Sequence, residues 1–243
     1  MHRLYVETSV LEAEVPILSK EASRHLKVLR PQKGEQFELF DALGAWRVYE
    51  FNGLGLLPIS SLSIATRHKR EIALFACVTK SSRWDWTIEK ATELGVDLIV
   101  PVISSRTIVR IPSSERQAKR ERWYRIAIEA VGQSGARFAP KINMPVDFDE
   151  ALNLLSSYEC FTGALTTPSP PSLLTALQNA SIKRNLAVFI GPEGDFTPEE
   201  LDKLLAVSKP VNLGETVLRA ETASIYGLSV LSAFRCAHSR ENL

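Results

Sequence analysis

After residue 71 the sequence alternates short apolar runs with amphipathic helical segments, and this alternation constrains the fold more than any other feature. Apolar runs that are each followed by a helix are typical of parallel strands whose two faces are both covered. The helical segments carry apolar residues at spacings of three and four, as in Trp84, Ile88 and Ala91. A mainly parallel sheet flanked by helices is therefore expected. Its strands are predicted at residues 72–78, 98–102, 160–165, 186–190 and 211–213.

The first 70 residues follow a different pattern. Between residues 34 and 66, short runs of β-forming residues are broken by turn sequences at 41–44 and 52–55, as in a small antiparallel barrel. One helix is predicted before them, at residues 19–29, and the polar, basic segment 65–71 is typical of a linker. The sequence thus predicts two domains, residues 1–70 and residues 71–243.

The composition is that of a globular protein. The 243 residues are 45% hydrophobic and 23% charged, which excludes a disordered or low-complexity chain. No apolar run is long enough to span a bilayer and no signal peptide is visible, so a cytoplasmic protein without membrane contact is predicted. The three cysteines and four histidines show no metal-ligand spacing, and no metal is expected.

Basic residues are concentrated in one stretch of the sequence. Residues 105–141 carry nine Lys or Arg residues against three acidic ones, a net charge of +6, whereas residues 142–243 carry a net charge of −5. Such a band is typical of a surface that contacts phosphates. A solvated helix face is the alternative, and charge alone favours it.

The most informative motif is a buried strand followed by a glycine-containing loop and a capped helix. Residues 186–190 (LAVFI) lead into GPEGDF at 191–196, and Thr197 with Glu200 forms a predicted capping box. Such a junction is where open α/β sheets bind ligands. The loop lacks the features of a phosphate loop or dinucleotide fingerprint, and its acidic residues would repel phosphate. A ligand without phosphate, such as S-adenosylmethionine, fits it; a tight structural turn is the alternative.

A second motif, LGETVLRAETA at residues 213–223, precedes an apolar helix. Arg219, Glu221 and Thr222 stand between hydrophobic segments, where a charged residue usually needs a partner. They either act on a ligand or pair with one another at the start of the helix.

Together these motifs resemble the SPOUT superfamily of knotted methyltransferases, and within it the family that methylates N3 of a uridine in 16S ribosomal RNA. The likeness runs over nearly the whole chain. Its motifs follow in the order HLKVLR (25–30), Lys80, KATELGV (90–96), the segment 133–140, IGPEGDF (190–196) and LGETVLRAETA (213–223). The sequence departs from the family pattern at two positions, where Asp195 replaces a glycine and Ala136 an arginine.

The resemblance implies an α/β fold in which a SPOUT domain with a trefoil-knotted parallel sheet, residues 71–243, follows a small PUA-like β-barrel domain that binds RNA. It also implies S-adenosylmethionine as cofactor, 16S ribosomal RNA of the small ribosomal subunit as partner, and a homodimer. The alternatives are a related enzyme acting on a ribose 2′-hydroxyl or another base, and a non-catalytic RNA-binding factor of ribosome assembly.

By the resemblance, three loops hold the cofactor, and methylation of uracil N3 requires a group that stabilises negative charge as the N3 proton leaves. Arg219 is assigned that role because a guanidinium donates two parallel hydrogen bonds and stays protonated, and Glu221 is expected to orient it. The expected cofactor-binding residues are Leu165, Thr166, Ile190, Gly191, Pro192, Glu193, Gly194, Leu213, Gly214, Val217, Leu218, Thr222 and Ala223. The expected RNA-binding residues are Arg3, His25, Lys27, Arg30, Lys80, Arg83, Lys119, Arg122, Arg125, Gln133 and Arg137.

Overall fold

The computed structural model describes residues 1–164, 168–181 and 184–239, which divide into two units. The first unit comprises residues 1–67 and 128–139, and the second comprises residues 68–127 and 140–243. The long helix α4 (Ser113–Ser134) contributes its first part to the second unit and its last turns to the first. None of the described helices is both long and apolar enough to cross a membrane.

The first unit is built on a five-stranded sheet. Its strands run in the order β1-β2-β3-β4, with β5 beside β3; β1 and β2 are parallel and the other pairs are antiparallel. The strands are β1 (His2–Tyr5), β2 (Gln36–Phe40), β3 (Ala45–Phe51), β4 (Leu56–Pro58) and β5 (Ser63–Ile64). Helices α1 (Thr8–Glu12) and α2 (Lys20–Leu29) pack against this sheet through a shared apolar core.

The helix predicted at residues 19–29 is confirmed. Ser19 is its N-cap, and the Ser19 hydroxyl accepts a hydrogen bond of 3.1 Å from the backbone N–H of Ala22. Leu26 and Leu29 are half-buried and pack on the core of the unit.

A cluster of buried charges fastens the segment 128–139 to the sheet of the first unit. The side chain of Glu38 on β2 is only 7% exposed, and its Oε1 accepts hydrogen bonds from Arg3 Nε (2.7 Å) and Arg137 Nη1 (2.6 Å). Arg3 also donates to the carbonyl oxygen of Ala136 (3.0 Å). Burial by itself would raise the pKa of the Glu38 carboxyl, but the hydrogen bonds from the two arginines outweigh burial and hold that pKa below its ordinary value.

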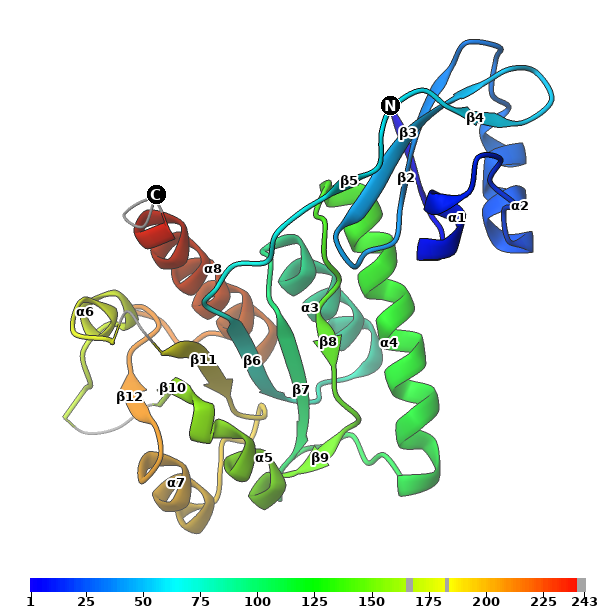
Figure 1. Ribbon diagram of the computed structural model, residues 1–243. Coiled ribbons are helices and arrows are strands. Elements are labelled where there is room, and N and C mark those ends of the chain that lie inside the picture. Colours follow the sequence, from blue (N-terminus) through cyan, green and yellow to red (C-terminus); the bar gives the residue numbers. More distant parts are fainter. Residues whose placement is uncertain (165–167, 182–183, 240–243) are drawn as a thin grey trace. The chain divides into compact units, whose positions relative to one another are not determined.

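The second unit is built on a parallel sheet, in which the strands follow the order β12-β10-β11-β6-β7-β8, with β9 beside β7 (Figure 1). Every strand pair in this sheet is parallel. The strands are β6 (Ile72–Cys77), β7 (Leu98–Ile103), β8 (Lys141–Ile142), β9 (Val146–Asp147), β10 (Tyr158–Gly163), β11 (Asn185–Ile190) and β12 (Lys209–Val211).

Helices cover both faces of this sheet, as the apolar strands require. On β6, Leu74 and Ala76 pack in one apolar cluster, and Phe75 and Cys77 pack in the other. The first cluster includes residues of α3 (Ser81–Glu93), α4, α6 (Leu173–Gln178) and α8 (Ala220–Ser239). The second includes residues of α5 (Phe148–Leu154), the short 3-10 helix η1 (Leu155–Ser157) and α7 (Pro198–Leu205). The expectation of an α/β fold with a parallel sheet is therefore confirmed.

The predicted strands are present with shifted ends. The strand predicted at 160–165 is β10 at 158–163, and the strand predicted at 211–213 is β12 at 209–211. The capping box at the start of α7 is confirmed, because the Thr197 hydroxyl accepts a hydrogen bond from the Glu200 N–H and the Glu200 carboxylate accepts one from the Thr197 N–H. The two-residue strands β8 and β9 were not predicted, because they are too short to show a period.

We expect Glu38→Gln to destabilise the first unit by about 3 kcal/mol at pH 7, because the substitution leaves two partly buried guanidinium groups without their carboxylate. The lowered pKa of Glu38 means that the carboxylate stabilises the fold at pH values above its ordinary pKa, and that this contribution is lost as the pH falls through the lowered value. Hydrogen exchange in peptides from residues 1–67 measures the effect.

Glu35→Gln is the control for this measurement, because the surface pair of Glu35 with His2, at 3.5 Å, contributes little, and glutamine can still accept the hydrogen bond of 3.0 Å that the Gln32 N–H donates to Glu35. If the two variants are equally stable at pH 7, the Glu38 carboxylate does not stabilise the first unit. The same conclusion follows if their difference in stability persists at a pH low enough to protonate Glu38 fully.

Candidate functional site

A cavity of about 350 Å³ opens at the carboxyl ends of β10, β11 and β12. This edge is where ligands bind in open parallel sheets, and the volume falls within the range of about 300–1,000 Å³ that is usual for small-molecule sites. The cavity is formed by the end of β10, the loop after β11, the loop after β12 and the first turn of α8. Its lining residues are Gly163, Ala164, Ile190, Gly191, Pro192, Glu193, Asp195, Val211, Asn212, Leu213, Gly214, Thr216, Val217, Leu218, Arg219, Ala220 and Ala223.

The loop after β11 is held in one shape by contacts at both of its ends. At Gly191 a side chain is sterically excluded, because a Cβ atom would lie 2.9 Å from the ring of Phe196. Asp195 has the left-handed backbone angle φ of +59°, and its N–H donates to the carbonyl oxygen of Pro192 (3.0 Å). Arg106 Nη1 donates to the carbonyl oxygens of Gly194 (3.0 Å) and Phe196 (3.1 Å), the two residues that flank Asp195.

The Asp195 departure from the family pattern is thus accommodated by the structure. Aspartate adopts left-handed backbone angles more readily than most residues with a side chain. The Asp195 carboxylate also accepts a hydrogen bond of 2.7 Å from the N–H of Phe196. A side chain here therefore leaves the turn intact.

The loop after β12 presents apolar side chains toward the cavity. Asn212 Oδ1 accepts a hydrogen bond of 2.7 Å from the N–H of Gly214, which turns the chain at the end of the strand. Val217 lines the cavity but is 77% exposed, and Leu218 beside it is half-buried. An exposed valine at the rim of a concave site provides an apolar contact for a ligand.

Four charged side chains lie at this edge of the sheet, and their pairing differs from the expectation. The sequence analysis expects Glu221 to orient Arg219. In the structure Glu221 Oε1 lies 3.6 Å from Arg83 Nε, and Arg83 Nη1 lies 3.6 Å from Glu193 Oε1. Arg219 lines the cavity, is exposed, and forms no ion pair with the residues that the structure describes. Its guanidinium is therefore available to a ligand.

Most of the expected cofactor-binding residues line this cavity. They are Ile190, Gly191, Pro192, Glu193, Leu213, Gly214, Val217, Leu218 and Ala223. Gly194 and Thr222 belong to the same segments but do not line it, and Leu165 and Thr166 lie outside the described residues. The sequence analysis did not include Gly163, Asn212 or Ala220. Gly163 and Asn212 lie at the ends of strands, so a correct placement of β10 and β12 would have pointed to them.

The expected RNA-binding residues fall into two groups. Arg3 and Arg137 hold the Glu38 cluster, Arg83 lies between two glutamates, and Arg122 donates to both carboxylate oxygens of Asp85. The others are not in ion pairs with described residues. They are His25, Lys27, Arg30, Lys80, Arg125 and Gln133, which are exposed, and Lys119, which is half-buried.

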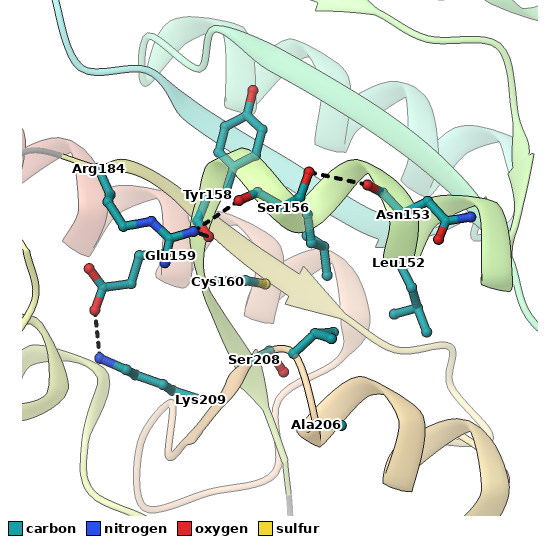
Figure 2. A pocket seen from close by; sticks show the side chains of 12 residues that line it. Leu152, Asn153, Ser156, Tyr158, Glu159, Cys160, Arg184, Ala206, Ser208 and Lys209 are labelled. Atoms are coloured by element: carbon teal, nitrogen blue, oxygen red, sulfur yellow. Dashed lines mark hydrogen bonds and ion pairs between the residues drawn. The ribbon is translucent and has the colours of Figure 1, made fainter.

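A second cavity, of about 480 Å³, lies at the opposite ends of the same strands (Figure 2). Figure 2 shows that its charged side chains are turned to partners within the unit. Arg184 donates to the carbonyl oxygens of Ser156 (3.0 Å) and Tyr158 (2.8 Å), and Lys209 pairs with Glu159. This second cavity lies at the amino ends of β10, β11 and β12, whereas ligands of open parallel sheets bind at the carboxyl ends, so the first cavity is the candidate site. Throughout the described part of the chain, no cluster of His, Cys, Asp and Glu could hold a metal ion.

Comparison with known proteins identifies the family of this chain. The family model of the RNA methyltransferase domain matches residues 66–232. Ribosomal RNA small subunit methyltransferase E of Synechocystis sp. is 30% identical, covering 92% of this chain and 74% of its own length. The enzyme of the same name from Bacillus subtilis is 27% identical, covering 96% of both chains.

A solved structure extends the likeness to the fold. The crystal structure of a ribosomal RNA small subunit methyltransferase E from Neisseria gonorrhoeae, bound to S-adenosyl methionine, aligns with a TM-score of 0.81 and 26% identity, covering 96% of this chain and 97% of the other. The family model spans more than half of the sequence and includes every residue that lines the candidate site. The chain therefore belongs to the RNA methyltransferase family that includes ribosomal RNA small subunit methyltransferase E.

Proposed function

We propose that this protein transfers a methyl group from S-adenosylmethionine to N3 of a specific uridine in 16S ribosomal RNA of the small ribosomal subunit. The observation that carries the proposal is the cavity at the carboxyl ends of β10, β11 and β12, with an unpaired arginine among the described residues at its rim. Membership of the family and the likeness to a relative that binds S-adenosyl methionine support it.

The residues of the cavity fit this cofactor. Ile190, Leu213 and Val217 offer apolar surface, and the backbone of the two loops offers hydrogen-bonding groups for an adenine ring. Glu193 and Asp195 disfavour a phosphate but suit the positive charges of a sulfonium and an ammonium. The cofactor, when bound, supplies an electrophilic methyl group.

The chain must supply charge stabilisation for the nucleophile. Uracil N3 carries a proton at neutral pH, and its loss spreads negative charge onto the two flanking carbonyl oxygens. We assign Arg219 to one of these oxygens, which leaves the direction of approach to N3 open, because its guanidinium donates hydrogen bonds to a developing negative charge and stays protonated. Glu221 lies in the first turn of α8, two residues after Arg219, and contributes to the site through its pair with Arg83.

Methylation of RNA by the purified protein tests the function. With S-adenosylmethionine and either unmodified 16S RNA or assembled small subunits, we expect mass spectrometry of the digested RNA to show 3-methyluridine at one position. A methyl group on a ribose 2′-hydroxyl or on another base would instead identify a related enzyme. A protein that binds the RNA but neither binds the cofactor nor transfers a methyl group would be an assembly factor. Either result overturns the proposal.

Arg219→Ala should lower the single-turnover rate by about a hundredfold to a thousandfold, the usual effect of losing one donor to a developing negative charge. Cofactor affinity should fall far less, because the interaction is stronger in the transition state than in the ground state. Arg219→Lys should restore little, since an ammonium lacks the planar fork. The melting temperature should not change, because Arg219 is exposed. A near-normal rate in a folded, cofactor-binding Arg219→Ala variant would remove Arg219 from the mechanism.

We assign RNA binding to the domain of residues 1–70 and to the basic band on α4, and methyl transfer to the domain of residues 71–243. A flipped uridine must leave its stack to reach the cavity, so other surfaces must hold the RNA. His25, Lys27 and Arg30 on or next to α2 are exposed, as are Lys80 and Arg125, and these support the assignment.

Replacing Lys119 and Arg125 by glutamate should weaken RNA binding and make its salt dependence shallower, because fewer counterions are released from the RNA. Arg122 is kept in this variant because its pair with Asp85 gives it a structural role. Titration of RNA at several salt concentrations measures the slope, and calorimetry should find cofactor affinity unchanged. An unchanged RNA affinity would identify the band as a solvated helix face.

The same proposal includes finer features of fold and assembly. Insertion of β11 between β6 and β10, both of which precede it in the sequence, supports a trefoil-knotted path. The mostly antiparallel sheet of the first unit supports a PUA-like barrel. Tyr226 and Ala233 on α8 are exposed, and Phe234 is half-buried, which supports a homodimer formed through this helix. We place the enzyme in the cytoplasm, where its RNA substrate would be.

A further inference from the structure

We propose that Arg83 is a positioning residue of the methyl-transfer site, which fixes the spacing between the loop after β11 and the start of α8 through Glu193 and Glu221. The effect of Arg83 on methyl transfer rests on the proposed function, whereas the ion pairs themselves do not. This positioning role replaces the expectation that Arg83 contacts RNA phosphates.

The geometry places Arg83 between two segments of the site. Arg83 lies in the first turn of α3, which follows β6, whereas Glu193 lies in the loop after β11 and Glu221 in the first turn of α8. Two different nitrogens of the guanidinium face the two carboxylates, Nη1 toward Glu193 and Nε toward Glu221, each at 3.6 Å. An arginine can form ion pairs with two carboxylates in this way because its positive charge is spread over a rigid planar group.

Burial makes the contact with Glu221 the stronger constraint. The side chain of Glu221 is 13% exposed, and its Oε2 atom is buried without a hydrogen-bond partner among the described residues. A buried carboxylate needs an opposite charge, and Arg83 supplies the one ion pair that Glu221 forms within the described chain. Glu221 is thereby occupied, and Arg219, two residues earlier, is left free to face the cavity.

Charge gives the bridge a second effect. Without Arg83, two carboxylates would stand uncompensated at an edge of the sheet that an RNA polyanion has to approach. They would also repel each other and so tend to separate the two segments that line the cavity. Glu193 lines the cavity itself, so a shift of its loop changes the shape of the site.

Arg83→Gln should therefore affect the single-turnover rate much more than the cofactor affinity. The side chains of Arg83 and Glu193 are 39% and 27% exposed, so loss of the pairs should weaken cofactor affinity only about twofold to fivefold. The single-turnover rate with saturating RNA should fall by about a hundredfold, since a misplaced catalytic group is costly. Arg83→Lys should recover part of this rate.

A charge-compensated variant distinguishes this role from a contact with phosphate. If Arg83 acts on the carboxylates, Arg83→Gln combined with Glu193→Gln should be faster than Arg83→Gln alone. If Arg83 instead contacts a phosphate, the rate at saturating RNA should be near normal, the salt slope of RNA binding should fall by about 1, and Glu193→Gln should restore nothing. The second set of results overturns the proposal.

Hydrogen exchange of the cofactor-free protein tests the bridge without any assay of activity. Arg83→Gln should speed exchange in peptides that cover residues 191–195 and 218–224. Lys203→Gln, which removes an exposed ion pair with Asp149 in the same unit, should leave both peptides unchanged. Unchanged exchange rates in Arg83→Gln refute the bridge. If instead the wild-type protein fails to methylate RNA, the proposed function is refuted, and the exchange rates alone decide whether the bridge exists.

Discussion

The pairing of β11 with β6 on one side and β10 on the other determines where the candidate site is located. Both faces of β11 are buried, so its register is fixed by packing as well as by hydrogen bonds. Phe189 pairs with Thr162 on β10, and Gly163 pairs with Val211 on β12, so the three strands end at a similar level. The loops that leave them converge at one edge. A slip of one residue would turn the side chains of β11 to the opposite faces of the sheet.

The hydrophobic periodicity of the sequence predicted most of the long strands and helices of the second unit. The strands β6, β7 and β11 and the helices α3 and α7 have apolar patterns or capping residues that depend only on neighbours along the chain. The strand order could not be predicted from such patterns. It depends on contacts between segments that lie far apart in the sequence, and hydrophobic strands of similar length do not specify their neighbours.

The same limit applies to the charged groups. Glu221 was expected to pair with a residue two positions away, but its partner Arg83 is supplied by another helix. Arg3, Glu38 and Arg137 are also far apart in the sequence, and nothing in their local patterns indicates that they meet. A count of basic residues therefore overestimates the surface available to RNA, because several of these arginines are held by carboxylates. The residues of the cavity were predicted better, since most belong to the loops that directly follow strands.

The left-handed turn at Asp195 has a consequence for how this loop can change over evolutionary time. A glycine at this position would adopt the left-handed angle without steric cost, whereas an aspartate adopts it at a modest cost that the surrounding contacts must offset. In this protein the guanidinium of Arg106, in the segment after β7, stabilises the turn by donating hydrogen bonds to the carbonyl oxygens of both neighbours of Asp195. Loss of the side chain at position 106 would therefore leave the left-handed turn at Asp195 without this support, so a comparison of relatives should consider positions 106 and 195 together.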